Sequence, residues 1–168
     1  PIRFAQEVER RQRHYAGFNL ILGDQEQAVY LSNRGEAPQA LAKGVYVMGN
    51  GLLHDDWAKH RHLRRRFTQE LLPLLQLTAE QQAAYDLDYA VWDILQDQRQ
   101  QPDDLLPQTY VGMEQERLLS SILIQSEDYG TRCSNFLVSN CGMWQWQEKS
   151  QQGITQGQII TQHIAITP

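Results

Sequence analysis

The sequence predicts an α+β fold in which helices are segregated onto mainly antiparallel sheets. Three observations predict it: β-rich runs with short polar loops come first, two segments of helical periodicity follow, and further β-rich runs close the chain. The 168 residues, 41% of them hydrophobic, are enough to build one buried core. We therefore expect a single domain over residues 1–168.

The first part of the chain predicts an antiparallel hairpin. Its two β-rich runs cover residues 17–23 and 28–32, and the four polar residues between them form a loop of hairpin length. A third strand is expected over residues 44–48, ending at a Gly-Asn-Gly sequence. Residues 4–14, ahead of the hairpin, have apolar positions at helical spacing and predict a short helix.

Two amphipathic helices are predicted in the middle of the chain. The first begins near Asp55 or Asp56, because acidic residues suit a helix N-terminus. The second begins at Thr78, which forms a capping-box pattern with Gln81, and it ends by Gln100. The first helix carries one apolar stripe, formed by Trp57, His60, Leu63, Phe67, Leu71 and Leu74.

A loop, a short helix and a run of strands are predicted after the second helix. Proline and aspartate residues indicate a loop over residues 101–108, and a helical turn or two is expected over residues 114–121. The expected strands cover residues 122–124, 133–139, 143–147 and 159–166, with a tight turn at residues 140–142.

Charge and composition argue against two classes of partner. The net charge of -5 gives no electrostatic reason to bind phosphate backbones, so we expect no nucleic-acid partner. No stretch approaches the roughly 20 apolar residues of a membrane helix, so we expect no membrane span. Two cysteines are too few for a disulfide framework, so we expect a reducing, cytoplasmic setting. The chain opens at Pro1 without an initiator Met, and we expect that a segment upstream of it is missing.

The histidines and basic residues of the first helix offer no metal site. His60 and His62 are two positions apart and point to different sides of a helix. The place of His60 on the apolar stripe indicates a hydrogen-bonded core histidine, with a ligand as the alternative. The charge run over residues 59–66 indicates a solvated face that includes Lys59 and Arg66, with an anion-binding or partner-binding surface as the alternative.

Aromatic residues and cysteines suggest structural roles. Tyr85, Tyr89 and Trp92 recur at helical spacing, which predicts packing under another element, or a cover for a flat aromatic ligand or a partner. Cys133 falls on a predicted strand and Cys141 in a predicted turn, so we expect no disulfide between them.

Four short segments occur in the order and spacing of a known family. They are residues 15–20, residues 32–35, residues 44–53 with Trp57 and Lys59 downstream, and residues 129–132 following residues 119–122. Together they resemble the NRDE family, the homologues of transport and Golgi organisation protein 2. The resemblance extends over nearly the whole chain, to Ser150.

The family is named for an Asn-Arg-Asp-Glu motif near its N-terminus, close behind a Cys that follows the initiator Met. This sequence contains neither element. The resemblance therefore implies that the chain is a C-terminal portion, with the first strands of the fold and the nucleophile upstream of Pro1 and no catalytic residue in this chain. It also implies part of a four-layer α/β/β/α sandwich resembling N-terminal-nucleophile hydrolases.

The resemblance also implies a pocket with Asn50 and Arg132 among its polar residues, and with Asn33, Arg34 and Trp57 as further candidates. An Asn amide is a neutral oxyanion donor, and a planar guanidinium can hold a carboxylate with two hydrogen bonds. The alternative for Asn50 is a turn residue in the left-handed conformation. The alternative for Arg132 is a surface or core salt bridge.

Three functions follow as hypotheses from the resemblance. The first is binding and trafficking of haem, held as a transported ligand through its carboxylates. The second is an amide (C-N) hydrolase with an N-terminal cysteine, which takes an amide substrate. The third is a scaffold or interaction module. In each case the upstream segment of the same protein is an expected partner.

Overall fold

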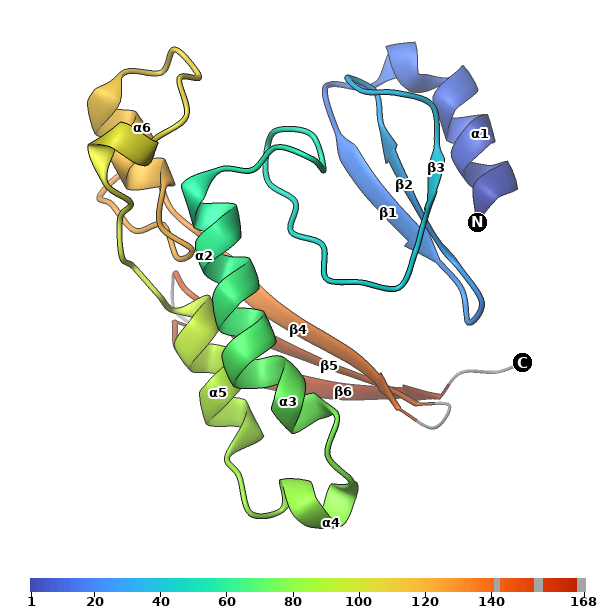
Figure 1. Ribbon diagram of the computed structural model, residues 1–168, viewed down its shortest axis with the longest axis vertical. Helices are drawn as coiled ribbons and strands as arrows, with labels where there is room; N and C mark the ends of the chain where they lie inside the picture. The colour runs from blue at the N-terminus through green and yellow to red at the C-terminus, as the bar shows by residue number, and fades with distance from the viewer. Residues whose placement is uncertain (141–142, 153–155, 166–168) are drawn as a thin grey trace. The chain divides into compact units, whose positions relative to one another are not determined.

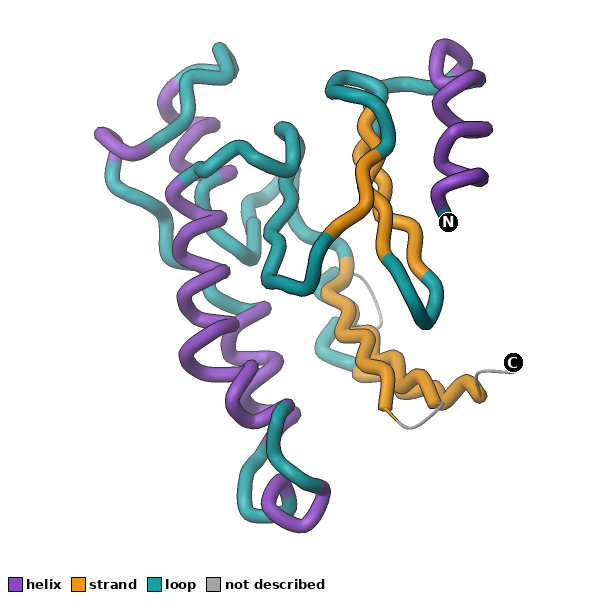
Figure 2. The backbone as a smooth tube through the Cα atoms, turned by 45° about the vertical axis from the view of Figure 1, so that its right-hand side comes forward, coloured by secondary structure: helices purple, strands orange, loops and turns teal. Residues whose placement is uncertain are grey.

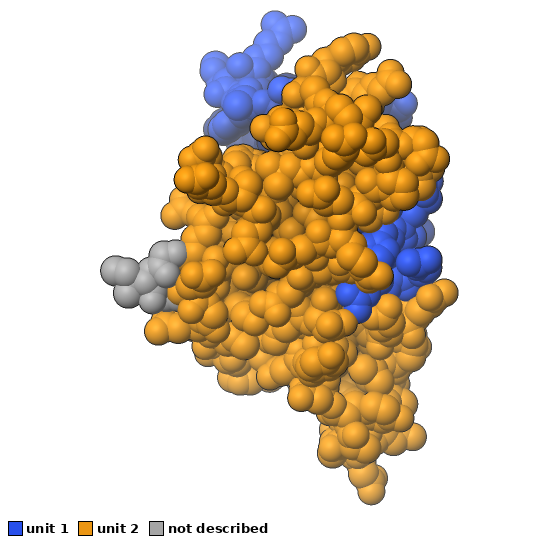
Figure 3. All heavy atoms as spheres, turned by 90° about the vertical axis from the view of Figure 1, so that its left-hand side faces the viewer, with its two compact units in different colours: residues 1–68 blue, residues 69–168 orange. Residues whose placement is uncertain are grey.

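The computed structural model describes residues 1–140, 143–152 and 156–165, and it confirms an α+β fold with two small antiparallel sheets (Figures 1 and 2). The chain divides into two compact units, Pro1–Thr68 and Gln69–Pro168, which Figure 3 colours separately. Each unit contains one three-stranded sheet. The single-domain organisation stays a prediction.

The first unit begins with a helix followed by a sheet. Helix α1 (Ile2–Arg10) leads through a 3-10 turn, η1 (Gln12–His14), to strands β1 (Asn19–Gly23), β2 (Ala28–Ser32) and β3 (Gln39–Leu41). All neighbouring strands are antiparallel, and β2 is the central strand. The predicted short helix and the predicted hairpin are therefore confirmed.

A small apolar core joins α1 to the sheet. Ala5 from the helix packs with Val29 and Leu31 of β2, and all three are almost completely buried. Burial of these side chains stabilises the pairing of helix and sheet, at roughly 1.5–3 kcal/mol for a side chain of the size of Val or Leu. At the hairpin turn, Oδ1 of Asp24 accepts hydrogen bonds from two backbone N–H groups, which closes the four-residue loop.

The expected third strand over residues 44–48 is wrong. The edge of β2 pairs instead with Gln39–Leu41, and residues 45–49 run as irregular backbone. The Tyr46 hydroxyl donates to the carbonyl of Ala42, and Val47 is buried. This segment therefore contributes apolar burial without a strand ladder, because the edge it would have used is already taken.

The first predicted helix exists, but its start is different. Helix α2 (Ala58–Arg66) has Trp57 as N-cap with no side-chain cap, whereas Asp55 accepts a hydrogen bond from the backbone of Leu52. The helix continues through a π-helical segment, η2 (Phe67–Leu71), into α3 (Leu72–Leu75). The change of helix type precedes Pro73, which has no N–H to donate.

The second predicted helix is divided in two. Thr78 forms the predicted capping box, but α4 spans only Ala79–Gln82, and a second side-chain cap, Asp86, starts α5 (Leu87–Leu95). The prediction that Tyr85, Tyr89 and Trp92 form one row on a single helix is therefore wrong, because Tyr85 lies in the turn between the helices. Tyr85 and Tyr89 are exposed, and Trp92 is buried.

The segment after α5 is mostly irregular, as predicted. It contains a 3-10 turn, η3 (Asp103–Leu105), and the expected short helix, α6 (Met113–Leu119). The expected strand over residues 122–124 is wrong. The backbone N–H of Ile124 donates to the Thr131 hydroxyl, and its carbonyl oxygen accepts from the Thr131 backbone N–H. These bonds to a loop residue form no strand ladder over residues 122–124.

The second sheet matches the prediction most closely. It consists of β4 (Cys133–Asn140), β5 (Met143–Ser150) and β6 (Ile159–Ala165), paired antiparallel in that order. Cys133 is an exposed free thiol. Cys141 and most of the expected tight turn lie outside the described residues.

Helix α5 packs on one face of this sheet. Nε2 of Gln147 in β5 donates to Asp88 at 3.1 Å, and the Lys149 ammonium lies 5.7 Å from the centre of the Trp92 ring. Strand β6 is an edge strand whose residues are exposed along its whole length. Within the described parts of the chain, no helix has the length and apolar character needed to cross a membrane.

Candidate functional site

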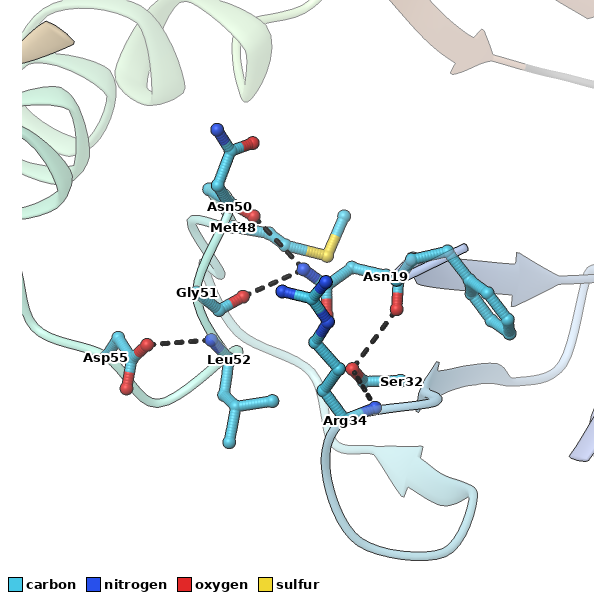
Figure 4. A pocket seen from close by; sticks show the side chains of 11 residues that line it. Asn19, Ser32, Arg34, Met48, Asn50, Gly51, Leu52 and Asp55 are labelled. Atoms are coloured by element: carbon cyan, nitrogen blue, oxygen red, sulfur yellow. Dashed lines mark hydrogen bonds between the residues drawn. The ribbon is translucent and has the colours of Figure 1, made fainter. Parts of the chain in front are cut away.

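A pocket in the first unit collects several residues singled out by the sequence (Figure 4). Its volume of about 600 Å³ falls within the range of small-molecule sites. The wall comes from the ends of β1 and β2 and from the loop after residue 47. The lining residues are Gly17, Phe18, Asn19, Ser32, Arg34, Met48, Gly49, Asn50, Gly51, Leu52 and Asp55.

Asn19, at the start of β1, fastens the loop to the sheet. Its Nδ2 donates to the carbonyl oxygens of Gly49 at 3.1 Å and Gly51 at 2.8 Å. Its Oδ1 accepts from the Tyr30 hydroxyl at 2.7 Å, and that hydroxyl accepts from the backbone N–H of Leu53 at 3.2 Å. One buried tyrosine and one amide therefore fix both ends of the pocket loop.

The two glycines of the loop are required by close packing. A Cβ on Gly49 would lie 2.4 Å from Nε2 of His60, and a Cβ on Gly51 would lie 2.0 Å from Oδ2 of Asp55. Neither glycine has a positive φ, and neither has Asn50. The left-handed turn considered for Asn50 is therefore wrong, since side-chain contacts explain the glycines on both sides of it.

Behind the loop, a histidine and a tryptophan support it. His60 is 2% exposed, and its Nδ1 lies 2.8 Å from the carbonyl oxygen of Asp55. Its ring stacks on Trp57 with centroids 5.1 Å apart. The predicted hydrogen-bonded core histidine is therefore confirmed for Nδ1. The other ring nitrogen, Nε2, is buried and has no hydrogen-bond partner among the described residues.

Arg34 supplies a positive charge to the pocket. Its guanidinium lies over Gly17, where a Cβ would come within 2.2 Å of Nε. Its backbone N–H donates to the Ser32 hydroxyl at 3.2 Å. Among the residues that the structure describes, no carboxylate pairs with the Arg34 guanidinium. This cation is available to a ligand with a carboxylate or phosphate group.

The basic helix face does not behave as a uniformly solvated surface. Arg66 is 8% exposed, so the prediction that it belongs to a solvated face is wrong. Lys59 is partly buried, and desolvation by this burial lowers its pKa. Arg61 and Arg64 instead pair with Asp56 at the start of the helix, at 3.2 and 3.4 Å.

The predicted pocket residues have different surroundings. Arg34 and Asn50 line the pocket, and the exposed Asn50 amide points away from Asn19 (Figure 4). Asn33 is used structurally, since its Oδ1 accepts from Phe18 at 2.8 Å and its Nδ2 donates to a nearby carbonyl. Trp57 supports the loop from behind. Arg132 is exposed and belongs to the second unit.

Sequence reasoning did not single out Asn19 or Tyr30. One signal was present, because Asn19 interrupts an apolar run at the start of a predicted strand. A polar side chain in such a place needs a hydrogen-bond partner. The partners lie 30 and 32 residues away, and local patterns could not identify them.

Within the described residues, no cluster of three or more histidine, cysteine or acidic residues could hold a metal ion.

Comparisons with known proteins agree with the motifs. The family model described as Transport and Golgi organisation 2 matches residues 1–152. A transport and Golgi organization protein 2 homolog from Bos taurus is 32% identical over 83% of this chain, which spans about half, 52%, of that relative. No solved structure matches. The chain therefore belongs to the transport and Golgi organisation 2 family, the NRDE family that its motifs resemble.

Proposed function

We propose that this chain carries the ligand-binding pocket of a haem-trafficking protein, with the Arg34 guanidinium holding a propionate carboxylate of haem. The observation that carries the proposal is the Arg34 charge, which lines a pocket of about 600 Å³ and pairs with no carboxylate among the described residues. The proposal includes the four-layer α/β/β/α sandwich that the family resemblance implies for the fold.

The chemistry of the pocket supports a carboxylate-bearing ligand. A guanidinium and a carboxylate form two parallel charge-assisted hydrogen bonds, which orient the ligand as well as bind it. Phe18 and the exposed side chain of Met48 add apolar and polarisable surface next to that charge. An amphipathic ligand with an apolar body and an anionic edge, such as haem, matches this combination. Reversible binding suits transfer from one protein to another.

Titration of the protein with haemin, followed by the Soret band, tests the proposal. Arg34→Ala is expected to weaken binding by roughly tenfold to a hundredfold, which corresponds to the loss of about 1.5–3 kcal/mol for a charged hydrogen bond. Arg34→Lys is expected to recover only part of the affinity, because an ammonium cannot form the paired contact.

Arg13→Ala is the matched control, because Arg13 is an exposed arginine of the same unit that does not line the pocket. Arg132→Ala tests the other arginine that the resemblance implied. If Arg132→Ala abolishes binding and Arg34→Ala has no effect, the carboxylate contact belongs to Arg132. If haemin does not bind the wild-type protein, the trafficking proposal fails.

The amide-hydrolase alternative places its nucleophile outside this chain. The thiol that the structure describes, Cys133, is exposed on β4, and the pocket belongs to the other unit. The alternative is tested by treating a longer family protein with an amide-mimicking electrophile and locating the label by mass spectrometry. Labelling of a first-residue cysteine would favour the hydrolase over the carrier and over a scaffold.

A further inference from the structure

The loop that forms one wall of the Arg34 pocket rests on a histidine with one unused nitrogen. Nδ1 of His60 lies 2.8 Å from the carbonyl oxygen of Asp55. Because a carbonyl oxygen only accepts, Nδ1 carries a proton, and Nε2 is the unprotonated nitrogen of a neutral ring. Nε2 is buried and has no partner among the described residues. Such atoms are rare in folded proteins and call for an explanation.

The surroundings of Nε2 suit a neutral ring. The ring stacks on Trp57, and a Cβ on Gly49 would come within 2.4 Å of Nε2. Neither neighbour offers a side-chain acceptor. A proton on Nε2 would therefore place a donor and a positive charge in a buried position with no acceptor in the described structure, which is unfavourable.

Charged and titratable groups of the loop, the helix and the sheet around this histidine are already engaged with other partners. On the loop, Oδ2 of Asp55 accepts from a backbone N–H at 2.7 Å. Asp56 precedes helix α2 and Arg64 lies on it, and these two residues, four positions before and after His60, pair with each other at 3.4 Å. From the sheet, the Tyr30 hydroxyl donates to Asn19 and accepts from the loop backbone.

We propose that His60 is a pH-sensitive latch on the pocket wall. The neutral ring holds the loop over residues 49–55 in its binding position, and protonation of Nε2 releases the loop and, with it, the ligand. Gly49, Asn50, Gly51, Leu52 and Asp55 all line the pocket, so movement of this loop changes the wall directly. The proposal rests on the carboxylate-binding function proposed above and adds its regulation.

The sign of the pH effect follows from which form fits the closed loop. Ligand binding favours the neutral ring, because the closed loop leaves Nε2 without an acceptor, so affinity falls when acid adds a proton to Nε2. Arginine guanidinium groups are not deprotonated in proteins, so this change in affinity comes from the histidine.

The test compares haemin affinity of the wild-type protein and His60→Asn at about pH 8 and about pH 5. The Asn amide nitrogen is bonded to Cγ, as Nδ1 is, so it can still donate to the Asp55 carbonyl but cannot take up a proton. We expect wild-type affinity to fall at least about tenfold and His60→Asn affinity to stay nearly constant. His60→Gln, which lacks a donor at that position, is expected to bind weakly at both pH values.

Gly49→Ala approaches the same contact from the other side. Its methyl group would meet Nε2, so binding at about pH 8 should weaken. In combination with His60→Asn, whose shorter side chain leaves room, the loss should be smaller than in the wild-type background. Additive losses would contradict a direct contact between residues 49 and 60.

Nitrogen-15 NMR of the His60 ring without haemin separates this inference from the proposed function. The latch requires a proton on Nδ1 alone at about pH 8, and loss of the Asp55 hydrogen bond when Nε2 is protonated. A ring that is protonated on Nε2 while the loop remains ordered would overturn it, as would equal pH dependence of haemin binding in wild type and His60→Asn. If haemin binds neither protein, the proposed ligand fails, and the ring spectra still decide the latch.

Discussion

The two sheets have the same number of strands and the same antiparallel order, but they are stabilised differently. In the first sheet, the central strand β2 is buried along most of its length, and Val29 and Leu31 pack against α1. In the second sheet the strands are longer, but the residues buried on it are the polar Ser134 and Gln147. Leu137, Ile160 and Ile164 of this sheet are about half exposed.

This difference shows that the length of the strands in a sheet does not determine how much apolar side-chain surface the sheet buries. The second sheet has long ladders, with Cα partners from Cys133–Ser150 to Asn140–Met143. The first sheet has shorter ladders, but its buried polar network holds the loop of the pocket. The candidate site therefore lies on the sheet whose positions are most constrained, as expected for a site that needs fixed geometry.

The largest expected effect comes from removing a core side chain of the first sheet. Leu31 is 1% exposed, so Leu31→Ala should lower the free energy of unfolding by about 2–5 kcal/mol. Leu137 is 55% exposed, and Leu137→Ala should change the free energy of unfolding by less than about 1 kcal/mol. Urea unfolding measures the free energy of unfolding of both variants. If both variants lose a similar amount of stability, the exposed face of the second sheet is covered in solution.

A smaller effect is expected from the buried polar groups of the two sheets. Tyr30→Phe leaves Asn19 Oδ1 and the Leu53 N–H without their partner, which should cost about 1–3 kcal/mol. Gln147→Leu removes an amide whose Oε1 has no hydrogen-bond partner in the described structure, so it should be nearly neutral. Denaturation curves compare the two; a larger loss for Gln147→Leu would mean that its bond to Asp88 matters more than the Tyr30 network.

The smallest expected effect concerns one exposed carboxylate in each unit. Hydrogen bonds from the Gln27 and Glu26 backbones lower the pKa of Asp24, and the Arg117 guanidinium lowers the pKa of Asp103. Because both pKa values lie below the ordinary 3.8, each carboxylate stabilises the fold above that pH, and this contribution is lost as the pH falls through the folded pKa.

Salt distinguishes the two carboxylates. NMR titration in low and high salt should move the pKa of Asp103 back toward its ordinary value, because its partner is a screened charge. The pKa of Asp24 should move less, since its main partners are neutral backbone groups. Equal salt sensitivity at the two sites would show that charge, and not backbone hydrogen bonding, sets the pKa of Asp24.

Local chemistry accounts for the correct part of the prediction. The hairpin from β1 to β2, the Thr78 capping box and the hairpin of β4 and β5 each follow from a pattern within one short stretch of the sequence. The expected strand over residues 44–48 failed for the opposite reason. The strand propensity of these residues was suitable, but Gln39–Leu41 occupied the free edge of β2. Strand propensity does not predict which of two segments pairs with an edge.

The sequence by itself determined the α+β class, the main hairpins and the family to which the chain belongs. Through the family resemblance, it also supplied Arg34 as a candidate pocket residue. The tertiary structure decided which residues meet: Asn19 reaches the loop 30 residues away, and His60 packs against Gly49. The physical reason is that hydrogen-bond partners and close contacts depend on distance in space, which the chain sets only when it folds.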